Sequence, residues 1–205
     1  MKAHQVTPGK IIILNGTSSS GKTSIVRALQ DILDEPFLDA GIDKFIWMLP
    51  RRYLDRPLWD KVLGLATEAG PLGHRLMSGM HQAIAALSRA GNNVVADHVL
   101  VERRWLEECT RIFSELPALF VGVRCPLEVL ERREAMRKDR TLGQARAQFH
   151  LVHVHGIYDL EVDTSESSAE ACALEIKRRL EDGSSPEAFK CLRQQGAPCP
   201  YHNRI

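Results

Sequence analysis

One segment constrains the fold of this chain more than any other. Residues 16–23 read Gly-Thr-Ser-Ser-Ser-Gly-Lys-Thr and match the pattern G-x-x-x-x-G-K-[ST] at every fixed position. The apolar run at residues 10–14 precedes this motif, and from Gly21 onward the apolar residues recur with a helical period. A glycine-rich turn between a buried strand and a helix directs backbone N–H groups and the positive helix end toward phosphate. The segment therefore predicts a nucleotide-binding loop.

The residues of this loop have distinct expected roles. Those expected to bind nucleotide are Gly16, Thr17, Ser18, Ser19, Ser20, Gly21, Lys22, Thr23 and Ser24. The Lys22 ammonium can also bridge the β- and γ-phosphates during catalysis, and the Thr23 hydroxyl can hold Mg²⁺. A turn without a ligand would need neither group. The pattern alone does not separate a kinase from a GTPase, a motor or a regulatory ATPase.

The apolar pattern changes repeatedly between strand-like and helix-like, which is typical of α/β folds. Strands are expected at residues 10–14, 37–42, 93–97, 118–124 and 160–162. Helices are expected between Gly21 and Pro36 and at residues 76–90, 102–115, 126–138 and 169–180. We therefore expect a three-layer α/β/α fold with a five-stranded parallel sheet.

The composition excludes a disordered polymer, a collagen-like repeat and a disulfide-dense miniprotein. The chain has 205 residues, a length typical of one domain, with 44% hydrophobic and 26% charged residues. Its formal net charge of +1 gives no reason to expect nucleic acid or an anionic membrane as a partner. No apolar run reaches the roughly 18 residues of a spanning helix, and the N-terminus shows no apolar signal region. We expect a cytoplasmic protein, and a homo-oligomer is compatible with the sequence.

Cysteine and histidine patterns give weaker signals. The cysteines are Cys109, Cys125, Cys172, Cys191 and Cys199, an odd and scattered set that does not suggest a disulfide framework. The first three lie in apolar patterns and are expected to be buried. The last two, with His202, lack the tight spacing of a metal site. His150, His153 and His155 lack acidic neighbours at ligand spacing, so packed or hydrogen-bonded histidines are expected there.

Two aspartates follow predicted strands where a phosphoryl-transfer site needs carboxylates. Asp43 comes directly after the strand at residues 37–42 and should reach the γ-phosphate region at the carboxyl edge of the sheet. There it could take the proton of an acceptor hydroxyl, or it could only cap a following helix. Asp97 ends the next predicted strand. It could bind Mg²⁺ with Thr23, hydrogen-bond the Thr23 hydroxyl, contact the acceptor, or merely cap a loop.

A cluster of basic residues follows the fourth predicted strand. It contains Arg132, Arg133, Arg137, Lys138 and Arg140. The ordinary interpretation is a solvated helix face paired with nearby acids. Next to a phosphate loop, mobile arginines can instead neutralise charge on the phosphoryl group in transfer. Arg133, Arg137 and Arg140 share about one helical face and are candidates for phosphate contact, as is Arg124 at the end of a strand.

Several segments together resemble one family. They are Ile13–Thr23, Gly41–Asp43 with Met48–Pro50, Ala90–Asp97, Val121–Cys125, Glu131–Arg140 and Tyr158–Thr164. In order and spacing, over residues 10–182, the chain resembles the chloramphenicol 3-O-phosphotransferase family of P-loop kinases. The resemblance implies transfer of the ATP γ-phosphate to a primary hydroxyl of a small acceptor, chloramphenicol or a similar amphipathic alcohol. It also implies that Asp43 is the general base and that Arg133 and Arg137 are catalytic residues of a lid.

The same resemblance organises the chain. Residues 1–182 are expected to form a P-loop kinase domain, with an arginine-rich lid at about residues 133–152. An acceptor-side insertion is expected at about residues 44–75, and a loosely ordered tail at residues 183–205. The sequence departs from the family mainly in this insertion and at His98, where a second acidic residue would be expected.

The acceptor side leaves alternatives open. Apolar residues that could line an acceptor pocket, or simply pack in the core, are Phe45, Trp47, Met48, Trp59, Met77 and Met80. A charged acceptor would instead depend on Arg51, Arg52 or Arg56. The alternative functions are therefore a nucleoside, sugar or adenylylsulfate type of kinase, or a non-kinase regulatory protein that binds nucleotide.

Overall fold

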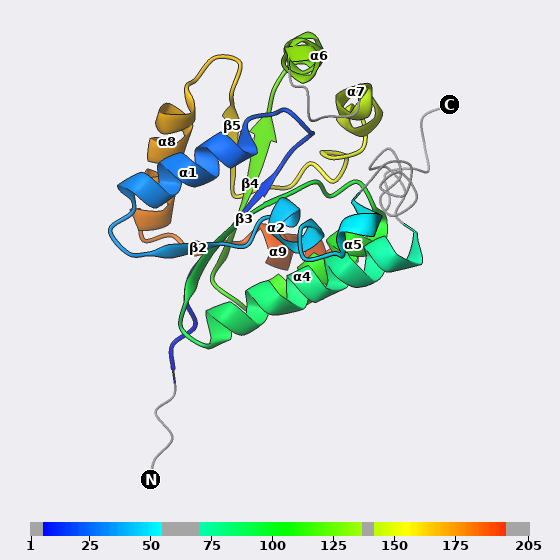
Figure 1. Cartoon of the computed structure of the whole chain (residues 1–205). Helices are drawn as coiled ribbons and strands as arrows, with labels where there is room; N and C mark the ends of the chain where they lie inside the picture. Colours follow the sequence, from blue (N-terminus) through cyan, green and yellow to red (C-terminus); the bar gives the residue numbers. More distant parts are fainter. Residues whose placement is uncertain (1–5, 55–69, 137–141, 196–205) are drawn as a thin grey trace.

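The computed structural model describes residues 6–54, 70–136 and 142–195, and one parallel sheet lies at the centre of the chain (Figure 1). Its strands are β1 (Ile11–Asn15), β2 (Phe37–Asp39), β3 (Asn93–His98), β4 (Ala118–Arg124) and β5 (Leu160–Asp163). Their order across the sheet is β2-β3-β1-β4-β5. The expected five-stranded parallel sheet is confirmed, and the phosphate loop follows its central strand.

Helices cover both faces of the sheet, which gives the expected three layers (Figure 1). One face carries α1 (Lys22–Ile32) and α8 (Ala169–Glu181). The other carries α4 (Pro71–Arg89), α5 (Arg103–Phe113) and α9 (Ala188–Gln194). The remaining helices are the short α2 (Ile42–Ile46), the 3₁₀ helix η1 (Arg51–Tyr53), α6 (Leu127–Met136) and α7 (Gln144–Phe149). In the described part of the chain, no helix has the length and apolar character needed to cross a membrane.

The β1 strand is buried on both faces, as its β-branched run predicts. Ile11 and Ile13 belong to the core formed with α4, α5 and α9. Ile12 and Leu14 belong to the opposite core, formed with α1 and α8. Both neighbouring strands are parallel to β1, and Ile11 is paired in register with Val94 of β3. The loop that follows β1 is therefore carried by the buried central strand of the sheet.

The second strand is shorter than predicted. It ends at Asp39 instead of Ile42, and α2 begins at Ile42 after an extended Gly41. β2 is an edge strand that pairs with β3 over Phe37–Asp39. The Ala40 N–H still donates to the Val95 carbonyl of β3 at 2.9 Å, and the chain then leaves the sheet at Gly41. Asp43 consequently lies in the first turn of a helix and not at a strand end.

The described part of the C-terminal tail, residues 183–195, is ordered, contrary to the prediction. It contains α9, where Ala188, Phe189 and Leu192 are buried. The Phe189 ring stacks on Phe120 of β4, with ring centroids 4.4 Å apart. A short apolar face hidden in a Gly/Pro/Ser-rich context therefore completes the core.

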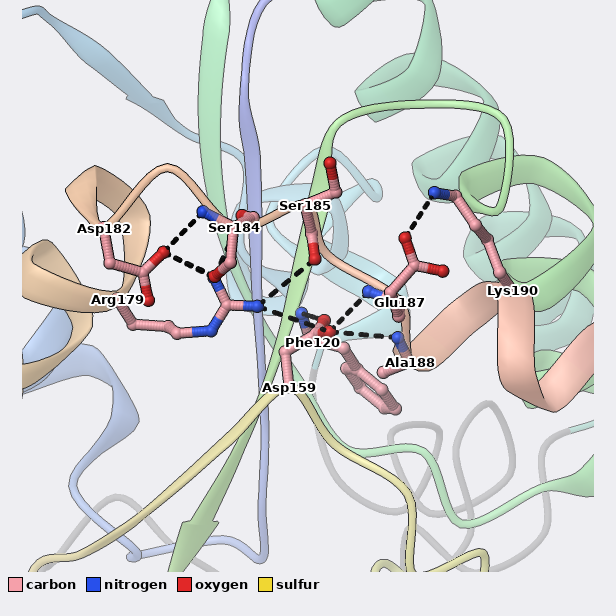
Figure 2. Close-up of polar contacts among 9 residues, drawn as sticks. All are labelled: Phe120, Asp159, Arg179, Asp182, Ser184, Ser185, Glu187, Ala188 and Lys190. Carbon is pink, nitrogen blue, oxygen red and sulfur yellow. Dashed lines mark hydrogen bonds and ion pairs between the residues drawn. The ribbon is translucent and has the colours of Figure 1, made fainter.

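A buried carboxylate connects α9 to the sheet (Figure 2). The Asp159 side chain is 3% exposed and lies 3.9 Å from the Arg179 guanidinium. Its Oδ1 accepts hydrogen bonds from the N–H groups of Glu187 and Ala188, at 2.6 and 3.0 Å. Its Oδ2 accepts the Phe120 N–H at 2.9 Å. One side chain thus holds β4, α8 and the start of α9 together.

The cysteines agree with their predicted burial. Cys109, Cys125 and Cys172 are buried and free, and Cys191 is free and partly exposed. Burial raises the pKa of the Cys109 thiol well above its usual value. These thiols therefore behave as small apolar side chains.

Candidate active site

The phosphate loop has the backbone that its sequence predicts. Ser19 and Gly21 have φ angles of 63° and 87°, in the left-handed region that turns the chain toward α1. Gly16 leaves no room for a side chain, since a Cβ there would lie 2.6 Å from the Val123 carbonyl oxygen. No side chain caps α1, so its positive N-terminal end faces the loop. The geometry is that of an anion cradle.

Lys22 is held inside this cradle. Its ammonium donates hydrogen bonds to the carbonyl oxygens of Gly16, at 2.8 Å, and Thr17, at 2.6 Å. The residue is 7% exposed, so its charge is concentrated on the loop and not spread into solvent. Lys22 is therefore a buried cation at the place where phosphates would be received.

A cavity of about 220 Å³ opens beside the loop at the carboxyl edge of the sheet. The phosphate-loop residues that line it are Ser18, Ser19, Ser20, Gly21, Lys22, Thr23 and Ser24. Asp43 and Asp97 line the same cavity, as their sequence positions predicted. Its remaining wall includes apolar groups from Ile42, Val99 and Trp105. Two carboxylates, one buried cation and an apolar surface thus share one hollow.

Asp97 lies at the centre of this arrangement. Its Oδ2 accepts the Thr23 hydroxyl at 2.9 Å, which brings the two predicted metal ligands together. Burial raises the pKa of the Asp97 carboxyl above its usual value, against the opposing effect of the Lys22 charge. Gly41 passes so close that a Cβ there would lie 2.1 Å from Asp97 Oδ1. The need for glycine at this position was not predicted from the sequence.

Asp43 is not the N-cap of α2, which was the alternative to a role in proton transfer. The N-cap of α2 is Gly41, and Asp43 follows it within the first turn. Its carboxylate lies in the cavity beside the phosphate loop instead of capping the helix. A carboxylate at the helix N-terminus is also favoured by the helix dipole.

Arg133 lies on the other side of the phosphate loop from Asp43. Its guanidinium donates to the Thr164 hydroxyl at 3.0 Å and to the Thr164 carbonyl oxygen at 2.7 Å. It lines a second cavity of about 400 Å³ together with Ser19, Gly21 and Ser24 of the loop. The structure therefore brings Arg133 to the loop but not to the cavity that holds the two aspartates.

Of the other arginines predicted to contact phosphate, Arg124 is described by the structure, whereas Arg137 and Arg140 are not. Arg124 donates to Glu161 at 2.7 Å, and its guanidinium lies over the Tyr158 ring, 5.7 Å from the centroid. It lines neither of the two cavities described above. Arg137, Lys138 and Arg140 lie outside the described residues, as do Arg56 and Trp59 of the insertion and Cys199 and His202 of the tail.

Asn15, which the sequence did not single out, connects the loop to its surroundings. Its amide nitrogen donates to the Val152 carbonyl and to the Tyr158 hydroxyl, both at 2.8 Å. Its amide oxygen accepts the Leu100 N–H at 2.9 Å. The residue before the phosphate loop is thus fixed to the segment that follows α7. The only sequence signal for this role of Asn15 was its position between the predicted strand and the phosphate loop.

His153 and His155 are packed and hydrogen-bonded, as predicted, whereas His150, for which the same was predicted, is exposed and meets the Phe149 ring edge to face. His153 Nδ1 accepts the Tyr158 hydroxyl at 2.6 Å, and the His155 ring stacks on Phe120. Burial, with the nearby Arg124 charge, lowers the pKa of His153 to about 3 and that of His155 to about 4. Both rings are therefore neutral at pH 7.

A second histidine cluster lies beneath Asp97. His81, His98 and Cys109 have potential ligand atoms within 4.8 Å of one another. His98 Nδ1 accepts the Val99 N–H at 2.7 Å, so its proton sits on Nε2 and is donated to His81 Nε2, 2.8 Å away. His81 then donates from Nδ1 to Glu108 at 2.9 Å. Both Nε2 atoms share this hydrogen bond, so the chain of contacts forms a buried polar brace between α4, β3 and α5.

The fold and this site define a class of protein. A loop with a buried lysine follows the central strand of a five-stranded parallel sheet, and two carboxylates face it; this is the arrangement of a P-loop phosphotransferase. Residues 9–181 match the family described as chloramphenicol phosphotransferase-like protein, and the chain belongs to that family. The match ends before α9, which lies outside it.

One relative agrees with this family, and two solved structures of lower identity share the fold. A Mycobacterium tuberculosis protein, found in strains CDC 1551 and H37Rv and provisionally named an O-phosphotransferase, is 36% identical over 200 residues. The alignment covers 91% of this chain and 89% of that protein. A sugar kinase from Janibacter has a similar structure, with TM-score 0.62 and 18% identity, covering 85% of this chain and 95% of that one. Shikimate kinase from Acinetobacter baumannii has TM-score 0.58 and 17% identity, covering 89% and 98%.

Proposed function

We propose that the protein transfers the γ-phosphate of ATP to a hydroxyl group of a small amphipathic alcohol, with chloramphenicol as the first acceptor to test. One observation supports this above the others: Asp43, Asp97 and Lys22 line a single cavity beside the phosphate loop. A regulatory nucleotide-binding protein would need the loop, but it would not need a second carboxylate facing it from α2. The partner we propose is therefore a small-molecule acceptor.

The nucleotide would bind across the phosphate loop. The loop N–H groups and Lys22 would hold the β- and γ-phosphates, and the second cavity, near Arg133 and Thr164, offers room for the rest of the nucleotide. Arg133 is held by Thr164 and would contribute a fixed cation on that side. Arg124, Arg137 and Arg140 remain candidates for phosphate contact.

Thr23 and Asp97 suit Mg²⁺ by their chemistry. A hydroxyl oxygen and a carboxylate oxygen, 2.9 Å apart, are the kind of ligands that this hard cation prefers, directly or through water. The raised pKa of Asp97 reflects a buried carboxyl whose negative charge a cation would stabilise. When bound, Mg²⁺ would neutralise charge on the β- and γ-phosphates.

Asp43 is the proposed general base. As the acceptor oxygen bonds to the γ-phosphorus, the bond from that phosphorus to the β–γ bridging oxygen breaks, and ADP leaves. The acceptor's proton passes to the Asp43 carboxylate. Ile42, Val99 and Trp105 give the same cavity an apolar wall, which suits an acceptor with a hydroxyl on an apolar or aromatic body.

The test is direct phosphorylation. The protein is incubated with Mg·ATP and chloramphenicol, and mass spectrometry looks for a product about 80 Da heavier, the mass of one phosphoryl group. Asp43→Asn should lower kcat by about 10²–10⁴-fold, the usual contribution of a general base, and leave nucleotide affinity unchanged. A product from wild type that persists at full rate in Asp43→Asn would contradict the role of Asp43. If no product forms although ATP binds, the chloramphenicol assignment fails, and other hydroxylated small molecules become the acceptors to screen.

A further inference from the structure

Gln148 in α7 contacts the phosphate loop directly. Its side-chain oxygen accepts the Ser18 backbone N–H at 2.7 Å, although the two residues are 130 positions apart. Gln148 is 1% exposed, and it lines the same cavity as Lys22 and Asp43. A neutral amide from the lid segment is therefore fixed against the loop on the side where phosphoryl transfer is proposed.

The hydrogen bond to Ser18 determines which way this amide is oriented. A backbone N–H can only donate, so the Gln148 atom facing it must be the carbonyl oxygen Oε1. The NH₂ group, which can only donate, lies on the other branch of the planar amide. Within residues 6–54, 70–136 and 142–195, no hydrogen bond joins this nitrogen to another group. An unpaired amide donor on a residue that lines the cavity is available to a ligand that accepts a hydrogen bond.

The backbone around Gln148 is held from both sides. The buried Glu134 of α6 accepts the N–H groups of Gly143 and Ala145, at 2.7 and 2.9 Å, and so fixes the start of α7. After α7, the Val152 carbonyl accepts the Asn15 amide at 2.8 Å. The amide is thus positioned before any ligand arrives, which is what stabilisation of a transient charge requires.

We infer that the Gln148 NH₂ group donates a hydrogen bond to the γ-phosphoryl group, recognising it in ATP and stabilising it during transfer. This inference rests on the proposed function. The γ-phosphoryl oxygens accept hydrogen bonds and gain importance as acceptors when charge spreads over them in the transition state. ADP lacks the group, so Gln148 discriminates between the two nucleotides.

Gln148→Glu is the sharpest test. A carboxylate of the same shape keeps an oxygen for the Ser18 N–H but replaces the donor with a negative charge facing the γ-phosphate. We expect affinity for a non-hydrolysable ATP analogue to fall at least tenfold, while ADP affinity changes less than about twofold. The kcat should fall about 100-fold, as expected for loss of an aligned donor. Titration calorimetry gives both affinities without any acceptor.

Ala147→Glu is the matched control. It adds the same charge to α7 one residue away, at a position that does not line the cavity. If Ala147→Glu lowers the ratio of ATP-analogue to ADP affinity as much as Gln148→Glu does, general electrostatics explains the effect and the inference is overturned. An unchanged ratio in Gln148→Glu overturns it as well. If Gln148→Glu does not fold, Gln148→Met removes the amide donor, together with the oxygen that accepts the Ser18 N–H, without adding charge. The ratio should still fall severalfold, because the Ser18 N–H is present for both nucleotides; an unchanged ratio there again overturns the inference.

The two proposals fail in different ways. If wild-type protein binds neither nucleotide, the proposed function itself is wrong. If wild type prefers the ATP analogue and Gln148→Glu keeps that preference, only the role of Gln148 is wrong.

Discussion

The two sides of the candidate site are built differently. On the nucleotide side, Lys22, Asn15 and Gln148 are almost fully buried, and each makes hydrogen bonds to backbone groups. On the acceptor side, Trp47 and Met48 at the end of α2 are 69% and 70% exposed. Under the proposed function, this difference predicts that the buried half carries the phosphoryl-transfer chemistry, while the exposed half determines acceptor choice and can change without unfolding the protein. Mutations on the two sides should therefore have different signatures.

Among residues that take no direct part in the proposed chemistry, the largest effect is expected at Gly41, where the two sides meet. An alanine Cβ would lie 2.1 Å from Asp97 Oδ1, so the carboxylate or α2 must move. Because Gly41 has φ −66°, its backbone tolerates alanine, and the damage should be local. Gly41→Ala should lower kcat about 100-fold, since a displacement of about 1 Å at a reacting group has that cost. Steady-state kinetics together with thermal unfolding measures both effects.

Gly79 provides the control for this substitution. It lies inside α4, and a Cβ there would meet nothing within 4 Å. Gly79→Ala should keep full activity and stabilise the protein by about 0.5–1 kcal/mol, because alanine is the better helix former. Equal activity in the two variants would mean that Asp97 does not need its observed position.

Part of the fold and part of the candidate site could be predicted from local sequence. The motif at residues 16–23 and the apolar runs were sufficient to predict the loop and the sheet, because phosphate binding and strand burial both follow from local sequence. Asp43 and Asp97 were predictable for a related reason, since the carboxyl ends of parallel strands share one edge. Asp43 reaches that edge from α2, because β2 ends after only three residues. The sequence did not predict this early end of the strand.

Other features depend on partners far away in sequence. The Arg133 side chain is held by Thr164, which lies 31 residues away, and nothing in a basic helix face specifies that contact. Its contact with phosphate stays a prediction. Gln148 carries no sequence signal at all, since a neutral amide in a polar segment is ordinary. The α9 helix was missed because a single apolar face of seven residues is too short for a periodic pattern.

The next effect is a loss in the free energy of unfolding, caused by a change on the sheet face that α4, α5 and α9 cover. Asp159 accepts three backbone N–H groups and lies near Arg179, so Asp159→Ala leaves buried donors without partners. We expect a loss of about 2–4 kcal/mol in the free energy of unfolding, measured by urea denaturation. Nucleotide affinity at low temperature should stay near wild type, because α9 packs on the face opposite α1. An unchanged midpoint would show that α9 does not support the fold.

Acid should lower the free energy of unfolding partly through two histidines on the nucleotide side. His153 and His155 are neutral in the folded protein, with pKa values lowered to about 3 and about 4. The unfolded chain takes up protons on these residues below about pH 6.5, so folding stability should fall as pH decreases from 6.5 to 4. The slope should be about 1 kcal/mol per pH unit for each histidine. The double variant His153→Asn/His155→Asn should flatten this slope in pH-dependent urea unfolding, and an unchanged slope would assign the acid sensitivity to other groups.

The smallest effect is expected at Trp47, and this variant tests the difference between the nucleotide side and the acceptor side. Its side chain is exposed, so Trp47→Ser should change the free energy of unfolding by no more than about 0.5 kcal/mol. Trp47 lines a small hollow that also contains Asp43 and Asp97, so an acceptor with an apolar body would lose contact area there. We expect the KM for the acceptor to rise about threefold to tenfold with kcat and ATP affinity unchanged, because about 1 kcal/mol of uniform binding is removed. A fall in ATP affinity would instead show that the exposed half also serves the nucleotide, and the division between a rigid chemical side and an adaptable acceptor side would have to be abandoned.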